Sequence, residues 1–339
     1  MKLLKNIKAL SVAAVVSTTA MSGVVQAEMI ERSFCVWDPI GANGPLFNVM
    51  KSAKPSAMKW GINLELKAYT DEKIAAEDFK AGQCDSVLLT GTRAREFNKF
   101  TGSLEAMGAI PSSEEMKMIL QTLTQPKAAQ LMVNGEYEVA GILPAGAIYL
   151  YTRDRAINTV EELQGKKVAT LDYDQASMTM VRHVGASVVG ASTANFAGKF
   201  NNGSVDVAYA PAVAYTPLEL YKGLGENGGV FDFALAQMNF QIIARTDRFP
   251  EGYGQKVRDY TSTRYEEAYK IVETAEAEIK KEYWMRPTAE QLEGYSKMLR
   301  EVRISLRDEG VYDAKALRLM RKVRCKNNPT NSECSEKRE

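Results

Sequence analysis

Two stretches of this chain alternate short apolar segments with helical ones, and this repeated rhythm constrains the fold most. The first stretch covers residues 33–100, from SFCVWD through INLELKAY to the segment after VLLTG. The second covers residues 165–211, from GKKVATLDY to VDVAYAP. Short strands that alternate with helices are typical of α/β architecture. Two such units in one chain predict two lobes with a cleft between them. Helices are expected over residues 92–100, 175–183 and 194–200.

The later part of the chain reads as one crossing strand followed only by helices. Residues 231–245 (FDFALAQMNFQIIAR) are expected to return the chain to the first lobe as an extended strand. Helical spacing then predicts helices over residues 263–284, 288–306 and 314–324. The expected organisation is lobe 1 at 28–143, lobe 2 at 144–240, and a return to lobe 1 with long C-terminal helices at 241–339, hinged near Leu143–Tyr149 and Gln237–Arg245.

The first 27 residues have the pattern of a secretory signal peptide. Lys2, Lys5 and Lys8 precede an apolar run at residues 9–20, and Val25-Gln26-Ala27 places small residues at the cleavage positions. A membrane anchor is the alternative, but the apolar run is short and rich in Ser and Thr. We therefore expect a soluble, exported mature chain.

The mature chain contains four cysteines, Cys35, Cys84, Cys325 and Cys334. An even number in an exported protein favours disulfides. A bond between Cys325 and Cys334 would pin the C-terminal tail, and Cys35 and Cys84 could join neighbouring strands. Free thiols are the alternative. The sequence has no CxxC spacing, which argues against a zinc site and against redox catalysis.

Charge and residue content argue against several classes of function. The chain has 43 Lys+Arg against 42 Asp+Glu, for a net charge of +1, and nucleic-acid binding normally needs a basic footprint. A single histidine, His183, leaves little basis for a multi-histidine metal site. No set of nucleophile, base and orienting residue stands out, so a hydrolase in the cleft is disfavoured. We expect no catalytic residues, no metal and no cofactor.

Polar and aromatic side chains follow the ends of several expected strands. In α/β sheets, ligands bind where strand ends meet the N-termini of the following helices. An aromatic wall with a few polar groups is typical of a small-molecule site. For each residue alone, a turn or packing role is the alternative. The ligand-binding candidates are Trp37, Asp38, Asn43, Thr90, Thr92, Arg93, Arg153, Asp172, Tyr173, Tyr209 and Asn239.

The second unit resembles the second lobe of TRAP-transporter solute-binding proteins. The resemblance is carried by VEELQGKK (160–167), by Gly185-Ala186 and by NNGSVD (201–206), and IIARTDRFPEGYGQKVRDYTSTRYEEAY is similar to the section that closes the family's first lobe. It implies a two-lobed periplasmic-binding-protein-like fold of type II. It also implies a monomeric periplasmic protein that captures a small polar solute and delivers it to the subunits of an integral-membrane transporter.

The opening SFCVWDPIGANGPLF resembles a narrower subgroup of solute-binding proteins. Some members carry the AdeT label, given as a component of an RND-type efflux pump. A pump subunit needs many membrane-spanning helices, and none follows the signal segment here. The alternative function is therefore a soluble accessory component of an envelope efflux system. Its docking face would be the last helix, where residues 315–326 include six basic side chains and no acid.

One departure from the family leaves the charge of the ligand open. The family's carboxylate-binding arginine is expected just after the segment GKK, where this chain has Ala169-Thr170. Arg153 and Arg155 are candidates to substitute for it, and surface positions are the alternative for both. Conversely, Asp38, Asp172 and Asp174 could make the cleft acidic and suit an amine-bearing ligand. Helix capping is the alternative role for these aspartates.

Overall fold

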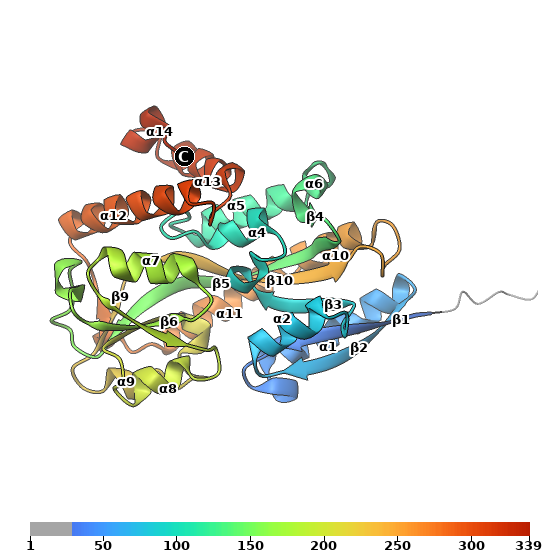
Figure 1. Ribbon diagram of the computed structural model, residues 1–339, viewed down its shortest axis with the longest axis horizontal. Helices are drawn as coiled ribbons and strands as arrows, with labels where there is room; N and C mark the ends of the chain where they lie inside the picture. Colours follow the sequence, from blue (N-terminus) through green and yellow to red (C-terminus); the bar gives the residue numbers. More distant parts are fainter. Residues whose placement is uncertain (1–28) are drawn as a thin grey trace, which may run out of the picture.

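The first lobe is built on three parallel strands. In the computed structural model, which describes residues 29–339, β1 (Ile30–Trp37) lies between β2 (Ile62–Tyr69) and β3 (Ser86–Thr90) (Figure 1). Every residue of β3 is buried, as expected for a central parallel strand with a continuous apolar sequence. The three strands expected within residues 33–90 are therefore confirmed. The expected signal peptide lies outside the described residues.

The helices of this lobe begin where local sequence signals place them. Helix α1 (Pro45–Lys59) has proline at its first position, where the missing N–H costs nothing. Helix α2 (Glu72–Lys80) is capped by Asp71, whose carboxylate accepts a hydrogen bond from the backbone N–H of Lys73 at 2.8 Å. Helix α1 packs on β1 and β2, and α2 packs on β3.

The single helix expected over residues 92–100 is wrong. The chain forms two short helices there, α3 (Gly91–Ala94) and α4 (Lys99–Gly102). Asn98 separates them because its backbone is extended and its side-chain oxygen accepts a hydrogen bond from the N–H of Thr101. Asparagine in this position ends one helix and caps the next.

Two long strands join the lobes into one sheet. The first half of β5 (Tyr137–Thr152) pairs antiparallel with β10 (Ala236–Arg245), and its second half pairs with β8 (Val207–Pro211). The sheet order is β2-β1-β3-β10-β5-β8-β6-β7. The expected hinge at Leu143–Tyr149 lies in β5, and the expected hinge at Gln237–Arg245 lies in β10. The expected lobe boundaries, 143/144 and 240/241, lie in the same two strands. The division of the chain at these boundaries stays a prediction.

The strand expected over residues 231–245 is interrupted. Its first residue ends β9 (Gly229–Phe231), and β10 begins only at Ala236. Between them the N–H of Asp232 donates to the carbonyl of Met285, which lies in β11 (Trp284–Met285). Strand β9 pairs with β11 rather than continuing into β10.

The second lobe follows the predicted order. Strands β6 (Lys167–Leu171) and β7 (Ser187–Ala191) pair in parallel, and β6 also pairs with β8. Helix α7 (Gln175–His183) spans the predicted residues, and α8 (Phe196–Asn201) starts two residues later than expected.

The last third of the chain is mostly helical and contacts both lobes. Helix α11 (Tyr265–Glu278) is shorter than the predicted 263–284, because Ile279 is extended and Trp284 enters β11. The other helices are α10 (Tyr253–Ser262), α12 (Ala289–Asp308), α13 (Ala314–Asn327) and α14 (Ser332–Glu336). Helix α12 packs on α7 of lobe 2, and α13 packs on α5 (Ser113–Thr124) of lobe 1 (Figure 1).

Short elements complete the fold. They are α6 (Ala129–Met132), α9 (Tyr221–Leu224), β4 (Val133–Asn134), and 3₁₀ turns at Gly41–Asn43, Ser103–Glu105, Pro126–Ala128, Glu161–Leu163, Ala212–Ala214 and Lys281–Tyr283. Within residues 29–339, no helix combines the length and apolar character needed to cross a membrane.

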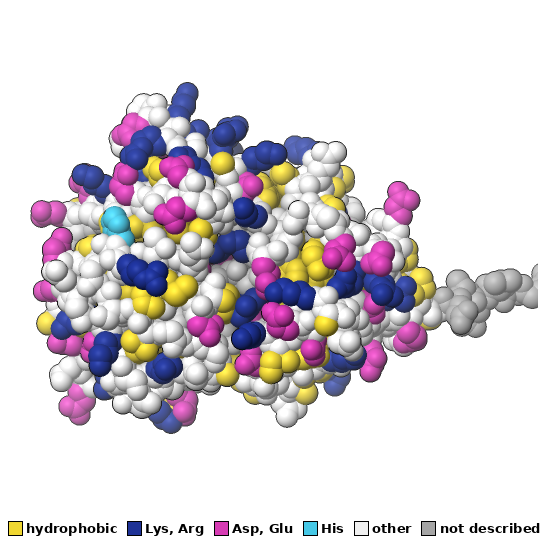
Figure 2. Space-filling view, viewed as in Figure 1, with side chains coloured by type: hydrophobic (Ala, Val, Ile, Leu, Met, Phe, Trp, Pro, Cys, Tyr) yellow, Lys and Arg dark blue, Asp and Glu magenta, His cyan; other side chains and the backbone are white. Residues whose placement is uncertain are grey.

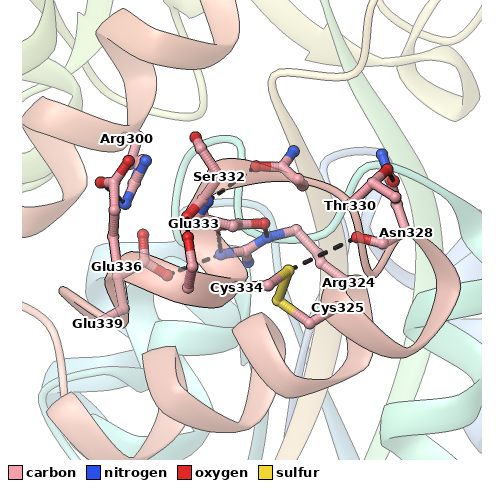
Figure 3. Close-up of a disulfide and its surroundings, with 12 residues drawn as sticks. Arg300, Arg324, Cys325, Asn328, Thr330, Ser332, Glu333, Cys334, Glu336 and Glu339 are labelled. Atoms are coloured by element: carbon pink, nitrogen blue, oxygen red, sulfur yellow. Dashed lines mark hydrogen bonds and ion pairs between the residues drawn. A yellow bond between two sulfur atoms is a disulfide. The ribbon is translucent and has the colours of Figure 1, made fainter.

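Both expected disulfides are present, so the free-thiol alternative is wrong. Cys35 of β1 is bonded to Cys84, just before β3, and Cys325 of α13 is bonded to Cys334 of α14. Beside the second bond, Arg324 lies between two carboxylates and pairs with Glu333 and Glu339 (Figure 3). Part of the basic character of α13 is therefore neutralised inside the protein.

Candidate functional site

A cavity of about 290 Å³ lies between the lobes. Lobe 1 contributes the ends of β1 and β3, through Trp37 and Thr90. Lobe 2 contributes Leu171, at the end of β6, and Tyr209 of β8. The cavity therefore lies at the edge where the parallel strands end, which is the usual ligand position in α/β sheets.

The walls are mainly apolar and carry an aromatic pair from each lobe. Trp37 and Phe240 have ring centroids 6.2 Å apart, and Phe196 and Tyr209 have centroids 5.6 Å apart. Aliphatic and proline side chains fill much of the remaining wall: Ile40, Leu46, Val49, Leu143, Pro144, Ile148, Met180, Leu218, Met238 and Ile271. Such walls suit a ligand with a substantial apolar part.

Asp38 lines the cavity but is occupied with its own backbone. The carboxylate accepts hydrogen bonds from the N–H groups of Ile40 at 2.9 Å, Leu46 at 2.8 Å and Phe47 at 3.1 Å. It thereby satisfies the first turn of α1, where free N–H groups favour an anion. Gly44 makes this possible, because a Cβ at that position would collide with the Asp38 carboxylate.

Glu105 is the buried carboxylate of the cavity wall. It is 4% exposed, and Oε1 accepts hydrogen bonds from the N–H groups of Asn239 at 2.7 Å and Gly91 at 3.2 Å. The hydroxyl of Thr92 donates to Oε2 at 2.6 Å. Burial raises the pKa of Glu105 to about 7, although these hydrogen bonds act in the opposite direction.

Arg95 and Asp174 form an ion pair across the lobes. The guanidinium Nη1 of Arg95, from lobe 1, is 3.3 Å from Oδ1 of Asp174, which precedes α7 in lobe 2. Arg95 Nε also donates to the carbonyl of Gly102 at 3.3 Å, and the guanidinium lies 5.0 Å from the ring of Tyr312. The hydroxyl of Ser177 donates to the other oxygen of Asp174.

Tyr173 makes a second contact between the lobes. Its hydroxyl donates to Oε2 of Glu72 at 2.7 Å, and the guanidinium carbon of Arg93 lies 3.3 Å from its ring centroid. The other oxygen of Glu72 accepts a hydrogen bond from the N–H of Thr90 at 2.7 Å. Burial raises the pKa of Glu72.

The structure brings eight of the eleven candidate residues to the cavity or directly beside it. Trp37, Asp38, Thr90, Thr92 and Tyr209 line it. Arg93, Tyr173 and Asn239 lie next to lining residues through the contacts described above.

The other three candidates do not line the cavity. Asn43 and Asp172 are exposed. Arg153 donates to the carbonyls of Phe200 at 2.9 Å and Gly223 at 3.1 Å, and so braces α8 against α9. The remaining arginine candidate, Arg155, is likewise bound to carbonyls, those of Gly228 and Glu282.

Sequence reasoning missed part of the polar wall. Glu105 comes from a 3₁₀ turn far from any strand end, and Tyr312 comes from the segment before α13. Arg95 could have been found, because it follows Arg93 by two residues after β3. At the position of the family arginine, Ala169 and Thr170 lie buried within β6.

The chain forms two α/β lobes that share a sheet and enclose a cavity at their strand ends. This is the architecture of the class of two-lobed solute-binding proteins. The sequence places the chain in one family of this class. Residues 49–339 match the family described as "Solute-binding protein AdeT 1/2", and the chain belongs to that family.

Relatives from Acinetobacter baumannii agree with this assignment. The chain is 44% identical over 301 residues to "Probable solute-binding protein AdeT1", covering 88% of this chain and 99% of the relative. It is 27% identical over 233 residues to "Probable solute-binding protein AdeT2", covering 69% and 98%.

Solved structures share the fold. A sugar acid binding protein of Advenella mimigardefordensis, in complex with galactonate, superposes with a TM-score of 0.71 at 11% identity, covering 87% of this chain and all of that one. A TRAP periplasmic solute-binding protein of Desulfovibrio salexigens, with bound orotic acid, has a TM-score of 0.70 at 12% identity, covering 87% and 97%. The expected two-lobed type II fold and the family resemblance are confirmed.

Proposed function

We propose that this protein is a periplasmic receptor that captures a small solute between its lobes and delivers it to a TRAP-like membrane transporter. It acts as a monomer, after removal of the signal peptide at residues 1–27. It binds its ligand without chemical conversion and without a cofactor. The closed form, with the solute enclosed, is the form that the transporter subunits recognise.

The observation that carries this proposal is that the cavity walls come from both lobes. A ligand that contacts both walls stabilises the closed arrangement over an open one, and only such differential contact can drive closure. The Arg95–Asp174 pair and the Tyr173–Glu72 hydrogen bond also join the lobes, and so belong to the closed state. Lobe closure of this kind is a common hinge motion.

Proteins of the same fold support a small-molecule ligand. Solved proteins of this fold have galactonate, orotic acid or malonate bound. Their identity to this chain is 11–12%, so they support the class of ligand, a small solute, rather than its charge.

Surface charge favours a solute over a nucleic acid. Acidic and basic side chains are interspersed over the face seen in Figure 2, with no continuous basic stripe there. On α13, the helix that a role in efflux would use for docking, Arg321 and Arg324 are 9% and 8% exposed. Both are therefore poorly placed to meet a partner, whereas Lys315, Arg318, Lys322 and Lys326 are exposed and leave α13 with four accessible basic side chains.

The test is thermal unfolding of the refolded mature chain, starting at Glu28, against a defined set of solutes. The set contains malonate, galactonate, orotate, amino acids and organic amines. A solute at about 100 times its dissociation constant adds about 2.7 kcal/mol to stability, which shifts the melting temperature by a few degrees. Small-angle scattering with the hit should show a smaller radius of gyration. If no solute shifts melting, the proposed function is wrong.

A further inference from the structure

We infer that the solute is an organic cation with an apolar body, whose ammonium group binds beside Glu105 and Asp174 while the body lies between the two aromatic pairs. This inference rests on the proposed function and names the ligand class of the same cavity.

Carboxylates outnumber guanidinium groups in the cavity wall. The lining acids are Asp38, Glu105, Asp174 and Glu267, and the lining bases are Arg95 and Arg264. Arg264 pairs with Glu267, three residues later, on α11, and Asp38 is bonded to three backbone N–H groups.

Glu105 and Asp174 therefore share one guanidinium, that of Arg95. Arg95 is 3.3 Å from Asp174 and is also bound to the carbonyl of Gly102. Fully ionised, this group carries one excess negative charge. Glu105 accepts three hydrogen bonds but, within residues 29–339, has no cationic side chain at ion-pair distance. A buried charge without a countercharge is costly, and a ligand ammonium would supply that countercharge.

An organic acid does not fit this arrangement. Its carboxylate would have to displace Asp174 from Arg95, and Asp174 would then lie buried among two other carboxylates. Like charges at such short range, away from water, repel strongly. The chain's own Asp174 thus occupies the position on Arg95 that a ligand carboxylate would need.

The walls suit the rest of a cation. Aromatic rings pack favourably against an apolar or aromatic body, and the pairs Trp37–Phe240 and Phe196–Tyr209 present rings from both lobes. Exposed Ile40 and Ile271 lie at the cavity wall and extend its apolar character toward solvent.

A donor among the described wall residues is left unsatisfied, and the cavity is small. Trp37 is 6% exposed, and its indole N–H has no hydrogen-bond partner within residues 29–339. Buried N–H groups are rarely left without an acceptor. The volume of about 290 Å³ is at the small end for ligand pockets, which limits the body to roughly one ring or a short chain.

The experiment uses three probes of equal size that differ only in head group: 3-phenylpropylamine, 3-phenylpropanoate and 3-phenylpropan-1-ol. Binding to the refolded mature chain is measured by titration calorimetry and by thermal unfolding at pH 7.5. We expect the amine to bind at least tenfold more tightly than the alcohol, and the acid to bind more weakly than either.

Two variants locate the head group. Glu105→Gln and Asp174→Asn should each weaken amine binding at least tenfold more than they weaken alcohol binding, because any effect on lobe closure acts on both probes alike. Glu266→Gln is the matched control, because Glu266 is exposed on α11 and pairs with Lys117 away from the cavity. It should leave all three affinities unchanged. Unfolding curves and circular dichroism confirm that each variant is folded.

The outcomes separate this inference from the proposed function. If the acid binds more tightly than the amine, or if amine and alcohol bind equally, the cation assignment is wrong and solute binding stands. If malonate or galactonate binds and the amine does not, the cation assignment is likewise wrong and solute binding stands. Loss of amine affinity in Glu266→Gln as large as in Glu105→Gln also overturns the assignment. If neither the probes nor the wider solute set bind, both proposals fail.

Discussion

The hydroxyl of Tyr173 donates a 2.7 Å hydrogen bond to Oε2 of Glu72, and this bond joins the end of β6 in lobe 2 to the start of α2 in lobe 1. The second oxygen of Glu72 is held by the N–H of Thr90 at 2.7 Å, so the acceptor is fixed in place. Arg93 lies over the tyrosine ring on the lobe 1 side. Tyr173 therefore makes two contacts between the lobes, and its hydroxyl should contribute to closure.

Tyr173→Phe should shift the ligand-free protein toward open forms. A hydrogen bond to a charged group contributes roughly 1.5–3 kcal/mol, and its loss leaves one Glu72 oxygen without a donor. The radius of gyration from small-angle scattering should increase in the variant. The melting temperature should also fall by a few degrees, because a loss of this size lowers the stability of the closed folded state.

Tyr221→Phe is the matched control for this variant. Tyr221 is 40% exposed on α9, and its hydroxyl makes only a 3.4 Å contact with Glu219, in the same lobe. Its scattering curve should match that of the native protein. Equal radii of gyration in Tyr173→Phe and Tyr221→Phe would show that the Tyr173 hydroxyl does not hold the lobes together.

The lobes could be predicted from sequence because their signals are local. The strand INLELKAY alternates apolar and polar residues, and the helix at residues 175–183 has helical spacing and is followed by Gly185 with a positive φ. Both were predicted to the residue. The errors occur where pairing between segments distant in sequence determines the secondary structure. Trp284 has helical spacing with its neighbours, yet it joins β11 because β9 offers a partner strand.

The same distinction explains which site residues were predicted. Trp37 and Thr90 end strands, so their place at the cavity edge follows from general rules for α/β sheets, and Tyr209 is expected at a strand end but lies in the middle of β8. Glu105 reaches the cavity because its carboxylate caps the N–H of Asn239, 134 residues away in β10. No spacing along the chain encodes that contact, and the same holds for the pairing of Arg95 with Asp174.

The two disulfides should differ in their resistance to reduction. Cys35 and Cys84 are fully buried, whereas Cys325 and Cys334 are partly exposed. Because thiol attack requires access to sulfur, a mild thiol reductant should open Cys325–Cys334 first. Alkylation followed by peptide mass spectrometry would show which cysteines react in the folded protein. Modification of Cys35 and Cys84 before unfolding would contradict this prediction.

Removing the disulfides should cost stability in the order of their loop lengths. The sequence separations are 49 residues for Cys35–Cys84 and 9 for Cys325–Cys334. Chain-entropy arguments give losses of about 4 and about 2.7 kcal/mol respectively. Denaturant unfolding of the two double Cys→Ala variants measures both. An equal or larger loss for the C-terminal pair would indicate that the buried ion pairs beside it depend on that bond.

Glu339→Gln should destabilise the protein strongly. The Glu339 carboxylate accepts hydrogen bonds from Arg303 at 2.6 Å and from Arg324 at 2.7 Å, and all three side chains are less than 10% exposed (Figure 3 shows Arg324 and Glu339). Removing one partner of a buried pair leaves uncompensated charge, at a cost of about 3–5 kcal/mol. The free energy of unfolding in denaturant measures the loss.

A neighbouring glutamate provides the control for this ion cluster. Glu336 pairs with Arg300 at 2.7 Å, but its side chain is 44% exposed. Glu336→Gln should therefore cost less than about 1 kcal/mol, as surface pairs do. Similar losses in Glu336→Gln and Glu339→Gln would mean that the cluster is accessible to water. The Glu339 variant also affects the cavity. Arg303 donates to the carbonyl of Met107, which lines the cavity, so Glu339→Gln should make the position of Met107 less well fixed.

Glu105 should make stability fall as pH rises toward neutrality. Burial raises its folded-state pKa to about 7, above the ordinary value of 4.5. Between these two values the folded state holds a proton that the unfolded state has lost. Linkage then requires the free energy of unfolding to decrease with increasing pH across this window. The full effect is about 3 kcal/mol between pH 4.5 and pH 7. Arg95 and Asp174, with Tyr312 beside them, are the charged and titratable groups that face this part of the wall.

Glu105→Gln removes this titration while keeping the shape of the side chain. Its amide oxygen can still accept from the N–H groups of Gly91 and Asn239, and Thr92 can rotate its hydroxyl to accept from the amide. The difference in unfolding free energy between variant and native protein should therefore grow in favour of the variant from pH 5 to pH 8. Other groups titrate in both proteins and cancel in the difference. A difference that is constant across this range would show that Glu105 is ionised in the folded protein at pH 5, because a nearby cation or water compensates its burial.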